Sequence, residues 1–193
     1  MNGELKVICG CTGSGKTSIA MKEFDPVKSG LVYDFQNHWG KLVFYDEKGE
    51  KIEKPGCKLI RSHTELSKLR LRVSPENFDI NSFIHIVKHL RGFTMVIEEA
   101  TGLFPNGIIS QDLIKLVLSK RHSKNDFIFV FHALNRIPPQ FIEFINELYL
   151  FNTYDLWRNV RSKFPKIYDD WRRIQANAVT NKYYFEKLTP PLS

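Results

Sequence analysis

The chain has 193 residues, of which 42% are hydrophobic, and this length supports one substantial core. No apolar run approaches the roughly 18 residues of a membrane-spanning helix, and the short stretch before the first apolar strand leaves no room for a signal peptide, so we expect a cytoplasmic protein. The formal net charge of +7, with a pI near 9.3, favours a polyanion such as nucleic acid as a partner.

A glycine-rich loop at residues 10–17 follows the first predicted strand, Leu5–Cys9, and matches the phosphate-binding pattern G-x-x-x-x-G-K-S/T at every fixed position. Glycines let the backbone curl so that N–H groups point at phosphates, and the helix expected at 18–24 presents its positive end to the same anion. Lys16 is predicted to reach the β and γ phosphates, and the Thr17 hydroxyl to ligate Mg²⁺. With ATP and Mg²⁺ as cofactors, the predicted nucleotide-binding residues are Gly10, Cys11, Thr12, Gly13, Ser14, Gly15, Lys16, Thr17 and Ser18.

The next segments predict a second buried strand and an insertion. Residues 30–35 are apolar up to an acid, and residues 41–45 and 51–53 flank a polar turn, which predicts a small hairpin within an insert at about 40–56. A short strand is expected at 57–61. The sequence Ser62-His63-Thr64-Glu65 matches a capping box, which predicts a helix that continues to about Val73.

Strands and helices then alternate. Apolar residues recur at helical spacing from Asp79 to Leu90. The further predicted elements are strands at 93–97, 127–131 and 148–151, and helices at 112–120 and from 138 to about 146. This alternation predicts the α/β class, with a mainly parallel sheet flanked by helices.

Two acids, Glu98 and Glu99, directly follow the apolar strand at 93–97, which is the Walker B layout of hydrolysing proteins. The carboxyl end of a parallel strand lies beside the phosphate loop. Glu98 is therefore predicted to hold Mg²⁺ through water, and Glu99 to polarise the attacking water as a base. The alternative is a helix N-terminus at which acids complement the helix dipole.

Two further polar residues are candidates for catalysis. His132 follows the strand at 127–131, and is either a sensor of the γ-phosphate or a turn residue. Arg121 closes the preceding helix, where it either complements the helix C-terminus or reaches, as an arginine finger, the ATP of a neighbouring subunit. The predicted catalytic residues are Lys16, Glu99, Arg121 and His132, and the predicted metal-binding residues are Thr17 and Glu98.

These motifs, in this order, resemble the FtsK/HerA superfamily of DNA-pumping ATPases over about residues 5–151. The residues that carry the resemblance are Gly13-Ser14-Gly15-Lys16-Thr17, Leu31-Val32-Tyr33-Asp34, Ile97-Glu98-Glu99-Ala100, Arg121 and His132. In that superfamily the second strand ends in an acid, Walker B ends in Asp-Glu-Ala, an arginine precedes the next strand, and that strand ends in a sensor glutamine. Here Glu98 replaces the usual aspartate and His132 the usual glutamine.

The resemblance implies a RecA-like P-loop NTPase fold and a ring, a hexamer or a pentamer, that threads DNA through its centre. The small size is similar to that of genome-packaging ATPases of icosahedral viruses with internal membranes. That similarity implies the host cytoplasm or the virion as location and capsid or vertex proteins as partners. Residues 121–126 also resemble Zot-like phage assembly proteins.

The chain is expected to divide into an ATPase core at 1–153 and a basic, aromatic extension at 154–193. The aromatic side chains of the extension either stack on nucleic-acid bases or pack it onto the core or the next subunit, and packing is favoured because aromatic residues are usually buried. They are Trp157, Phe164, Tyr168, Trp171, Tyr183 and Tyr184. His85 and His89 share a helix face that could bind a metal, but without further ligands a solvated face is favoured.

The function predicted from these patterns is an ATP-hydrolysing motor that moves or packages DNA. A small-molecule kinase fits the length and the loop equally well, although paired Walker B acids favour activation of water. A third alternative is a nucleotide-binding assembly protein of Zot-like type that does not hydrolyse ATP. A guanine switch protein is disfavoured, because the Asn-Lys-x-Asp motif is absent.

Overall fold

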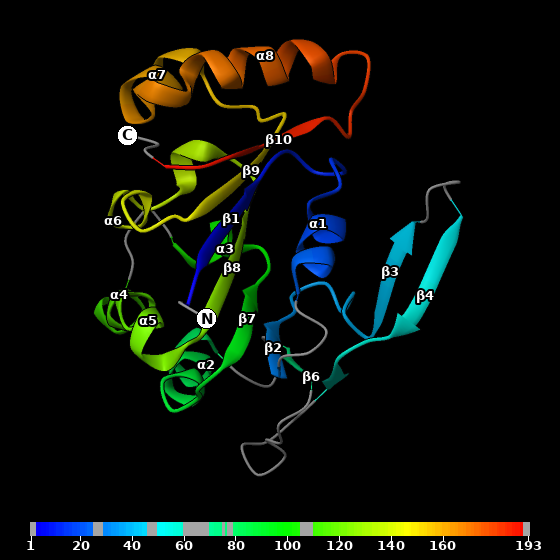
Figure 1. The fold of residues 1–193 in the computed structure, drawn as a ribbon, viewed down its shortest axis with the longest axis vertical. Helices are drawn as coiled ribbons and strands as arrows, with labels where there is room; N and C mark the ends of the chain where they lie inside the picture. Colours follow the sequence, from blue (N-terminus) through cyan, green and yellow to red (C-terminus); the bar gives the residue numbers. More distant parts are fainter. Residues whose placement is uncertain are drawn as a thin grey trace.

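A computed structural model of the chain describes residues 3–24, 29–45, 50–59, 70–74, 76, 79–104 and 110–190. An eight-stranded sheet forms its centre, with helices on both faces (Figure 1). The strand order is β10-β9-β1-β8-β7-β2-β6-β5, and every neighbouring pair is parallel except β10 with β9. The strands are β1 (Leu5–Cys9), β2 (Ser29–Tyr33), β5 (Lys58–Leu59), β6 (Arg70–Val73), β7 (Phe93–Ile97), β8 (Asp126–Phe131), β9 (Glu147–Phe151) and β10 (Phe185–Leu188). The prediction of a mainly parallel α/β sheet is confirmed.

Several helices begin where the sequence supplies a cap. The Asp79 carboxylate accepts a hydrogen bond from the Ser82 amide at 2.8 Å, and the Ser110 hydroxyl accepts one from the Leu113 amide at 3.3 Å. The helices are α1 (Lys16–Glu23), α2 (Ile80–Val87), α3 (Ala100–Leu103), α4 (Gln111–Leu118), α5 (Lys120–Ser123), α6 (Pro139–Ile142), α7 (Trp157–Lys163) and α8 (Tyr168–Ala178). No helix among the described residues is long and apolar enough to cross a membrane.

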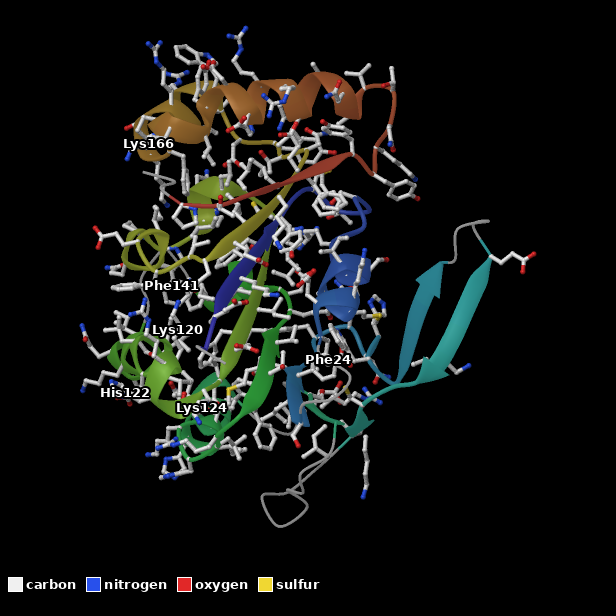
Figure 2. The ribbon with its side chains drawn as sticks, viewed as in Figure 1. Phe24, Lys120, His122, Lys124, Phe141 and Lys166 are labelled. Atoms are coloured by element: carbon white, nitrogen blue, oxygen red, sulfur yellow. The ribbon has the colours of Figure 1, made fainter. Side chains whose placement is uncertain are left out.

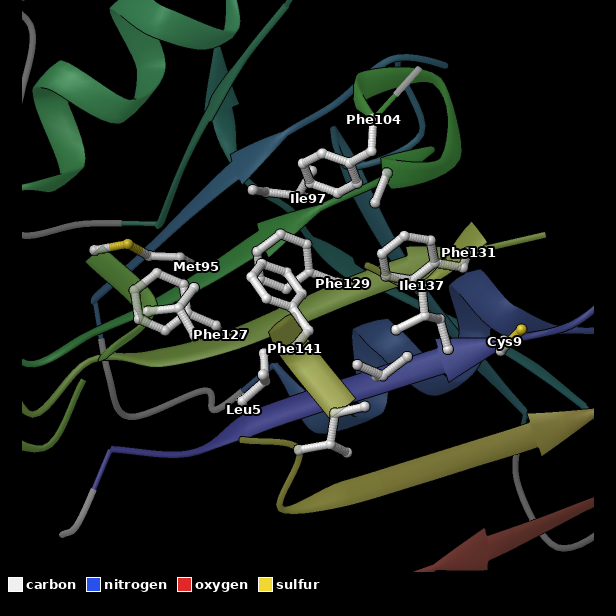
Figure 3. Close-up of a cluster of buried hydrophobic side chains, with 14 of the residues drawn as sticks. Leu5, Cys9, Met95, Ile97, Phe104, Phe127, Phe129, Phe131, Ile137 and Phe141 are labelled. Carbon is white, nitrogen blue, oxygen red and sulfur yellow. The ribbon is translucent and has the colours of Figure 1, made fainter. Parts of the chain in front are cut away.

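Alternation of side chains along β8 divides the core into two layers. Phe127, Phe129 and Phe131 point to one face, where they pack with Phe104 and Phe141 (Figure 3). The rings of Phe129 and Phe141 meet edge to face with their centroids 5.0 Å apart. The aliphatic residues between the phenylalanines point to the opposite face, where α1 packs. Burial of each ring stabilises the fold by about 1.5–3 kcal/mol, so β8 is a main source of stability.

The predicted hairpin is present as β3 (Lys41–Tyr45) and β4 (Lys51–Pro55), an antiparallel pair separate from the main sheet (Figure 1). Two backbone hydrogen bonds close its base: Gly56 donates to the Gly40 carbonyl at 3.3 Å, and Cys57 donates to the Trp39 carbonyl at 2.7 Å. The hairpin therefore begins and ends at one point beside α1.

The prediction that a helix continues to Val73 is wrong at the C-terminal end of that helix. Residues 70–73 form β6, which pairs in parallel with β2. Leu71 and Val73 are buried in the core, and Arg72 between them points to the other face, which is the period of a strand. The pairing with β2 overrides the local helical pattern. The capping box at 62–65 lies outside the described residues.

Two predicted helices differ from the observed ones in their extent. The helix predicted at 112–120 is α4 followed by α5, which meet at Ser119. The helix predicted to run to about 146 ends at Ile142, because Asn146 already pairs with β1: its amide donates to the Leu5 carbonyl at 2.8 Å, and its side chain accepts from the Leu5 amide at 2.8 Å.

The C-terminal segment packs across one end of the sheet as α7, α8 and β10 (Figure 1). Phe164 and Trp171 are buried in the core, and the Trp171 indole donates to the Thr153 hydroxyl at 3.0 Å. Trp157 and Tyr183 are each 56% exposed. Since β10 pairs with β9, β10 extends the main sheet, while α7 and α8 pack against the core.

Candidate nucleotide site

The phosphate loop joins the carboxyl end of β1 to α1, at the edge where the parallel strands end (Figure 1). Gly13 and Gly15 adopt φ angles of 76° and 98°, which residues with side chains rarely adopt. The N-cap residue of α1 is Gly15, which has no side chain to cap the helix, so the first N–H groups of α1 can face an anion.

The first two amides of the loop bind neighbouring strands. Gly10 donates to the Phe131 carbonyl at 3.1 Å, and Cys11 donates to the Asn152 carbonyl at 2.7 Å. Gly10 and Cys11 thus fix the loop to the ends of β8 and β9 instead of facing the cavity. The loop residues that line the cavity are Thr12, Gly13, Gly15, Lys16, Thr17 and Ser18.

This cavity has a volume of about 320 Å³. Polar side chains that follow three parallel strands form its other wall, because the carboxyl ends of these strands converge on it. They are Gln36 and His38 after β2, Glu98 and Glu99 after β7, and His132 after β8.

Lys16 extends across the cavity. Its ammonium group donates to the Cys11 carbonyl at 2.8 Å and lies 3.4 Å from Nδ1 of His132. Burial lowers the pKa of Lys16 from its ordinary value, although nearby carboxylates oppose the shift. A bound phosphate would give this ammonium group an anionic partner and so favour its charged form.

Thr17 and Glu98 form a second pair at the base of the cavity. The Thr17 hydroxyl donates to Oε1 of Glu98 at 3.0 Å. Oε2 of Glu98 and Nε1 of Trp39 are both buried, and neither meets the geometry of a hydrogen bond with a described residue, although the Trp39 indole lies near enough to favour the Glu98 carboxylate. Glu98 is 3% exposed, and burial raises the pKa of its carboxyl group. Such an unpaired buried oxygen is costly unless a proton, water or cation satisfies it.

Glu99 lies at the mouth of the cavity between two partners. Nε2 of His132 hydrogen-bonds to Oε2 of Glu99, and Nε2 of Gln36 donates to Oε1 at 3.0 Å. The hydrogen bond from His132 lowers the pKa of Glu99, so this side chain is a carboxylate at neutral pH. This arrangement fits a His132 ring whose Nε2–H donates to the Glu99 carboxylate while Nδ1 faces the Lys16 ammonium group.

Comparison with solved structures identifies the fold. The genome-packaging NTPase B204 of Sulfolobus turreted icosahedral virus 2, solved with AMP, superposes with a TM-score of 0.72 at 14% sequence identity, covering 98% of this chain and 94% of that chain. B204 of Sulfolobus turreted icosahedral virus, described as a DNA-packaging ATPase, gives a TM-score of 0.64 at 18% identity, covering 98% and 94%. The chain has a P-loop NTPase fold. Neither a protein-family model nor a curated protein sequence matches it.

The predicted resemblance to viral packaging ATPases is thus confirmed at the level of the fold. The N-terminal domain of zonular occludens toxin from Neisseria meningitidis is also similar, with a TM-score of 0.48 at 14% identity, covering 80% of this chain and 79% of that chain.

The P-loop site suits Mg²⁺. The Thr17 hydroxyl donates its hydrogen bond to Oε1 of Glu98, so the lone pairs of its own oxygen can face a cation, and Oε2 of the same Glu98 carboxyl group has no hydrogen bond among the described residues. Among the described residues no group of three or more His, Cys, Asp or Glu could hold a metal. P-loop sites need no such group, because substrate phosphates and water supply the remaining ligands of Mg²⁺.

Asp34, the acid at the end of β2, is engaged inside the protein rather than at the P-loop. Its carboxylate accepts from the amides of His38 at 3.1 Å and Trp39 at 3.2 Å, and pairs with the Arg72 guanidinium at 3.1 Å. These bonds hold the turn that carries Gln36 and His38 into the cavity. The role of Asp34 in this structure is therefore to position that turn.

Arg121 is the one predicted catalytic residue that lies away from the P-loop. It is exposed on α5, immediately before β8 begins, and so belongs to the opposite edge of the sheet. A cavity there is lined by Arg121, Leu118 and Glu143, among others. Within one chain, Arg121 does not reach the nucleotide cavity.

Sequence reasoning missed Gln36, His38 and Tyr183 in the cavity wall. Gln36 and His38 follow a predicted strand, so their position at the carboxyl edge was a usable signal. Tyr183 precedes the antiparallel β10 and had no such signal. It also lines an adjacent cavity of about 510 Å³, whose walls are Ser14, Gly15, Ser18, Ile19, Phe151, Tyr183 and Phe185.

Proposed function

We propose that this protein is an ATP-hydrolysing motor that moves DNA, and that it acts as a viral genome-packaging ATPase in a ring of identical subunits. The observation that carries the proposal is the Glu99 carboxylate, held by His132 and Gln36 beside the P-loop. The fold similarity to B204, described as a genome-packaging NTPase, and the net charge of +7 support DNA as the partner.

In this proposal the P-loop binds the triphosphate. The free N–H groups at the start of α1 and the Lys16 ammonium hold the β and γ phosphates, and Lys16 leaves the Cys11 carbonyl to do so. Thr17 and Glu98 would hold Mg²⁺, which would neutralise negative charge on the β and γ phosphate groups. The adjacent cavity lined by Phe151, Tyr183 and Phe185 suits a flat base.

Hydrolysis requires a water molecule in line with the γ-phosphate. Glu99 accepts a proton from that water as it attacks, while the hydrogen bond from His132 keeps the carboxylate oriented and ionised. His132 also lies 3.4 Å from the Lys16 ammonium, so it contacts both the base and the phosphate-binding residue. This contact suits a sensor of the γ-phosphate.

Arg121 completes the site in a ring. Because it lies at the opposite edge of the sheet, it can stabilise the transition state only from a neighbouring subunit. Closed cyclic symmetry would place every Arg121 at the nucleotide of the next copy.

Phosphate release from ATP, measured with and without DNA, tests the proposal. We expect turnover with Mg²⁺ that DNA increases, with inorganic phosphate as the product. Absence of turnover, or turnover indifferent to both single- and double-stranded DNA, would reject the motor. Transfer of the γ-phosphate to a nucleoside instead of water would establish the kinase alternative.

A further inference from the structure

A groove of about 580 Å³ lies between α2 and the α4–α5 pair, at the edge of the sheet opposite to the P-loop. In Figure 1 these helices lie together near the N-terminus. The lining consists mainly of polar and basic side chains, namely Asn81, Ile84, His85, Lys88, Arg91, Asp112, Lys115, Leu116, Ser119, His122 and Ser123.

The groove is basic and its cations are exposed. Lys88, Arg91 and Lys115 face one carboxylate, Asp112, so three positive charges less one negative charge leave a formal charge of +2 with the histidines neutral. The side-chain ammonium groups of Lys88 and Lys115 make no hydrogen bond or ion pair with a protein acceptor in the part of the chain that the structure describes. Arg91 donates through Nη1 to the carbonyls of Lys88 at 3.2 Å and Leu90 at 3.0 Å, and its other N–H groups remain available.

We propose that this groove binds the phosphate backbone of DNA. The proposal rests on the proposed function, in which DNA is the cargo, and it assigns the surface that holds that cargo. Phosphate oxygens accept hydrogen bonds from lysine, arginine, asparagine and serine, and the groove offers all four types. Contacts of this kind carry no sequence information, which suits a motor that must advance over any sequence.

The two sides of the groove connect directly to the nucleotide site. α2 leads into β7, whose far end carries Glu98 and Glu99, and α5 leads into β8, whose far end carries His132. β7 and β8 are paired with each other and buried in mid-sheet. A displacement of α2 or α5 on DNA binding would therefore be transmitted through β7 and β8 to Glu98, Glu99 and His132 at the other end of these strands.

A second basic surface provides a matched comparison. Arg158, Lys166 and Arg172 are exposed on and between α7 and α8, at the other end of the molecule; Figure 2 labels Lys166 there and His122 beside the groove. Removal of these three charges changes the net charge by the same amount as removal of the three groove cations. Any difference between the two variants then reports on position and not on total charge.

The test compares the groove variant Lys88→Gln, Arg91→Gln, Lys115→Gln with the control variant Arg158→Gln, Lys166→Gln, Arg172→Gln. Dissociation constants for labelled duplex and single-stranded DNA are measured at salt concentrations from about 50 to about 200 mM. Over this range, binding through phosphate contacts weakens strongly as salt increases. We expect the groove variant to bind DNA more weakly, with a slope of log affinity against log salt shallower by about 2 to 3, because each phosphate contact contributes roughly 0.9. The control variant should keep most of the wild-type slope, and basal ATP turnover without DNA should be unchanged in both.

The proposal is overturned if the groove variant keeps the wild-type slope or if the control variant loses more. It is also overturned if polyglutamate competes for the groove as well as unlabelled DNA does, since the groove would then serve an acidic protein segment. Should the triple variant fail to fold, Lys88→Gln and Lys115→Gln alone should each reduce the slope by about 0.9. A wild-type protein that binds no DNA at all would reject the proposed function, whereas binding that ignores the groove would reject only this inference.

Discussion

Glu99 adopts a left-handed backbone conformation, with φ of 53° and ψ of 35°, which non-glycine residues rarely adopt. Such a conformation costs about 1–3 kcal/mol and persists only where the surroundings impose it. Here it directs the side chains of two consecutive acids to different partners. Glu98 is buried against Thr17, and Glu99 hydrogen-bonds to His132. The sequence indicated two acids after a strand, but residue type alone does not reveal a positive φ at a glutamate.

Replacement of the proposed base should abolish turnover and spare binding. For Glu99→Gln we expect kcat to fall by about 10²- to 10⁴-fold, the usual contribution of general base catalysis, while the affinity for ATP stays within a few fold. Phosphate release and equilibrium binding of a labelled ATP analogue measure the two effects. Glu143→Gln, at an exposed position, is the matched control. A wild-type kcat in Glu99→Gln would contradict the assignment.

Glu98 should make stability depend on pH. Its pKa is raised in the folded protein, so folding favours the protonated form, and the contribution of Glu98 to stability is lost as the pH rises above its ordinary pKa. We expect Glu98→Gln, which keeps an oxygen acceptor for Thr17, to be more stable than the wild type at pH 7.5, with the difference shrinking toward pH 4.5. Thermal unfolding of both proteins without Mg²⁺ measures this. If the stability difference between Glu98→Gln and the wild type instead increased toward low pH, a raised pKa of Glu98 in the folded protein would be contradicted.

The parallel strands explain which elements could be predicted. Strands β1, β7 and β8 are mainly apolar, and a predicted site residue follows each along the chain. Lys16, Glu99 and His132 could therefore be assigned to one edge of the sheet from their order alone. β6 was mistaken for a helix because Leu71 and Val73 alternate over too few residues for their period to outweigh the capping box upstream. β10 could not be predicted because it is an antiparallel edge strand, and the formation of such a strand depends more on pairing with its neighbour, here β9, than on its own sequence.

The base of the β3–β4 hairpin depends on a close backbone approach. A Cβ atom at Gly56 would lie 2.3 Å from the Trp39 carbonyl oxygen, whereas at Gly40 the nearest atom would be 3.5 Å away, in the flexible Arg72 side chain. We expect Gly56→Ala to lower the free energy of unfolding by about 1–3 kcal/mol, and Gly40→Ala to change it by less than about 0.5 kcal/mol. Urea denaturation measures both. Equal stabilities for the two variants would mean that the hairpin base can shift without cost.

The turn before β10 should contribute to nucleotide affinity. Cδ1 of Tyr183 would lie 3.5 Å from a Cβ atom at Gly15, so its ring stands over the P-loop. If the ring stacks on the base, Tyr183→Ala should raise the Kd for ATP by about 5- to 150-fold, which corresponds to 1–3 kcal/mol. Tyr183→Phe should retain affinity, and Tyr154→Ala, at a residue 83% exposed and outside both cavities, is the control. Unchanged affinity in Tyr183→Ala would remove the ring from the site.

At the scale of the whole molecule, Arg121 and the P-loop lie at opposite edges of the sheet. This arrangement predicts that one subunit is catalytically incomplete. When Arg121→Ala subunits are mixed with wild type, ATP turnover should fall more steeply than in proportion to the mutant fraction, because one mutant disables its neighbour's site. Mixtures with Arg136→Ala, at another exposed arginine, are the control. A linear decline in the Arg121→Ala mixtures would count against action between subunits.

The short central strands set the distance between the groove and the nucleotide site. β7 has five residues and spans about 16 Å at roughly 3.3 Å per residue. Hydrogen bonds to β2 and β8 on either side prevent it from stretching or bending independently. In the proposed motor, the groove and the nucleotide site would thus be separated by less than about two nanometres of hydrogen-bonded strand, so a small displacement at one end would reach the other over a short path.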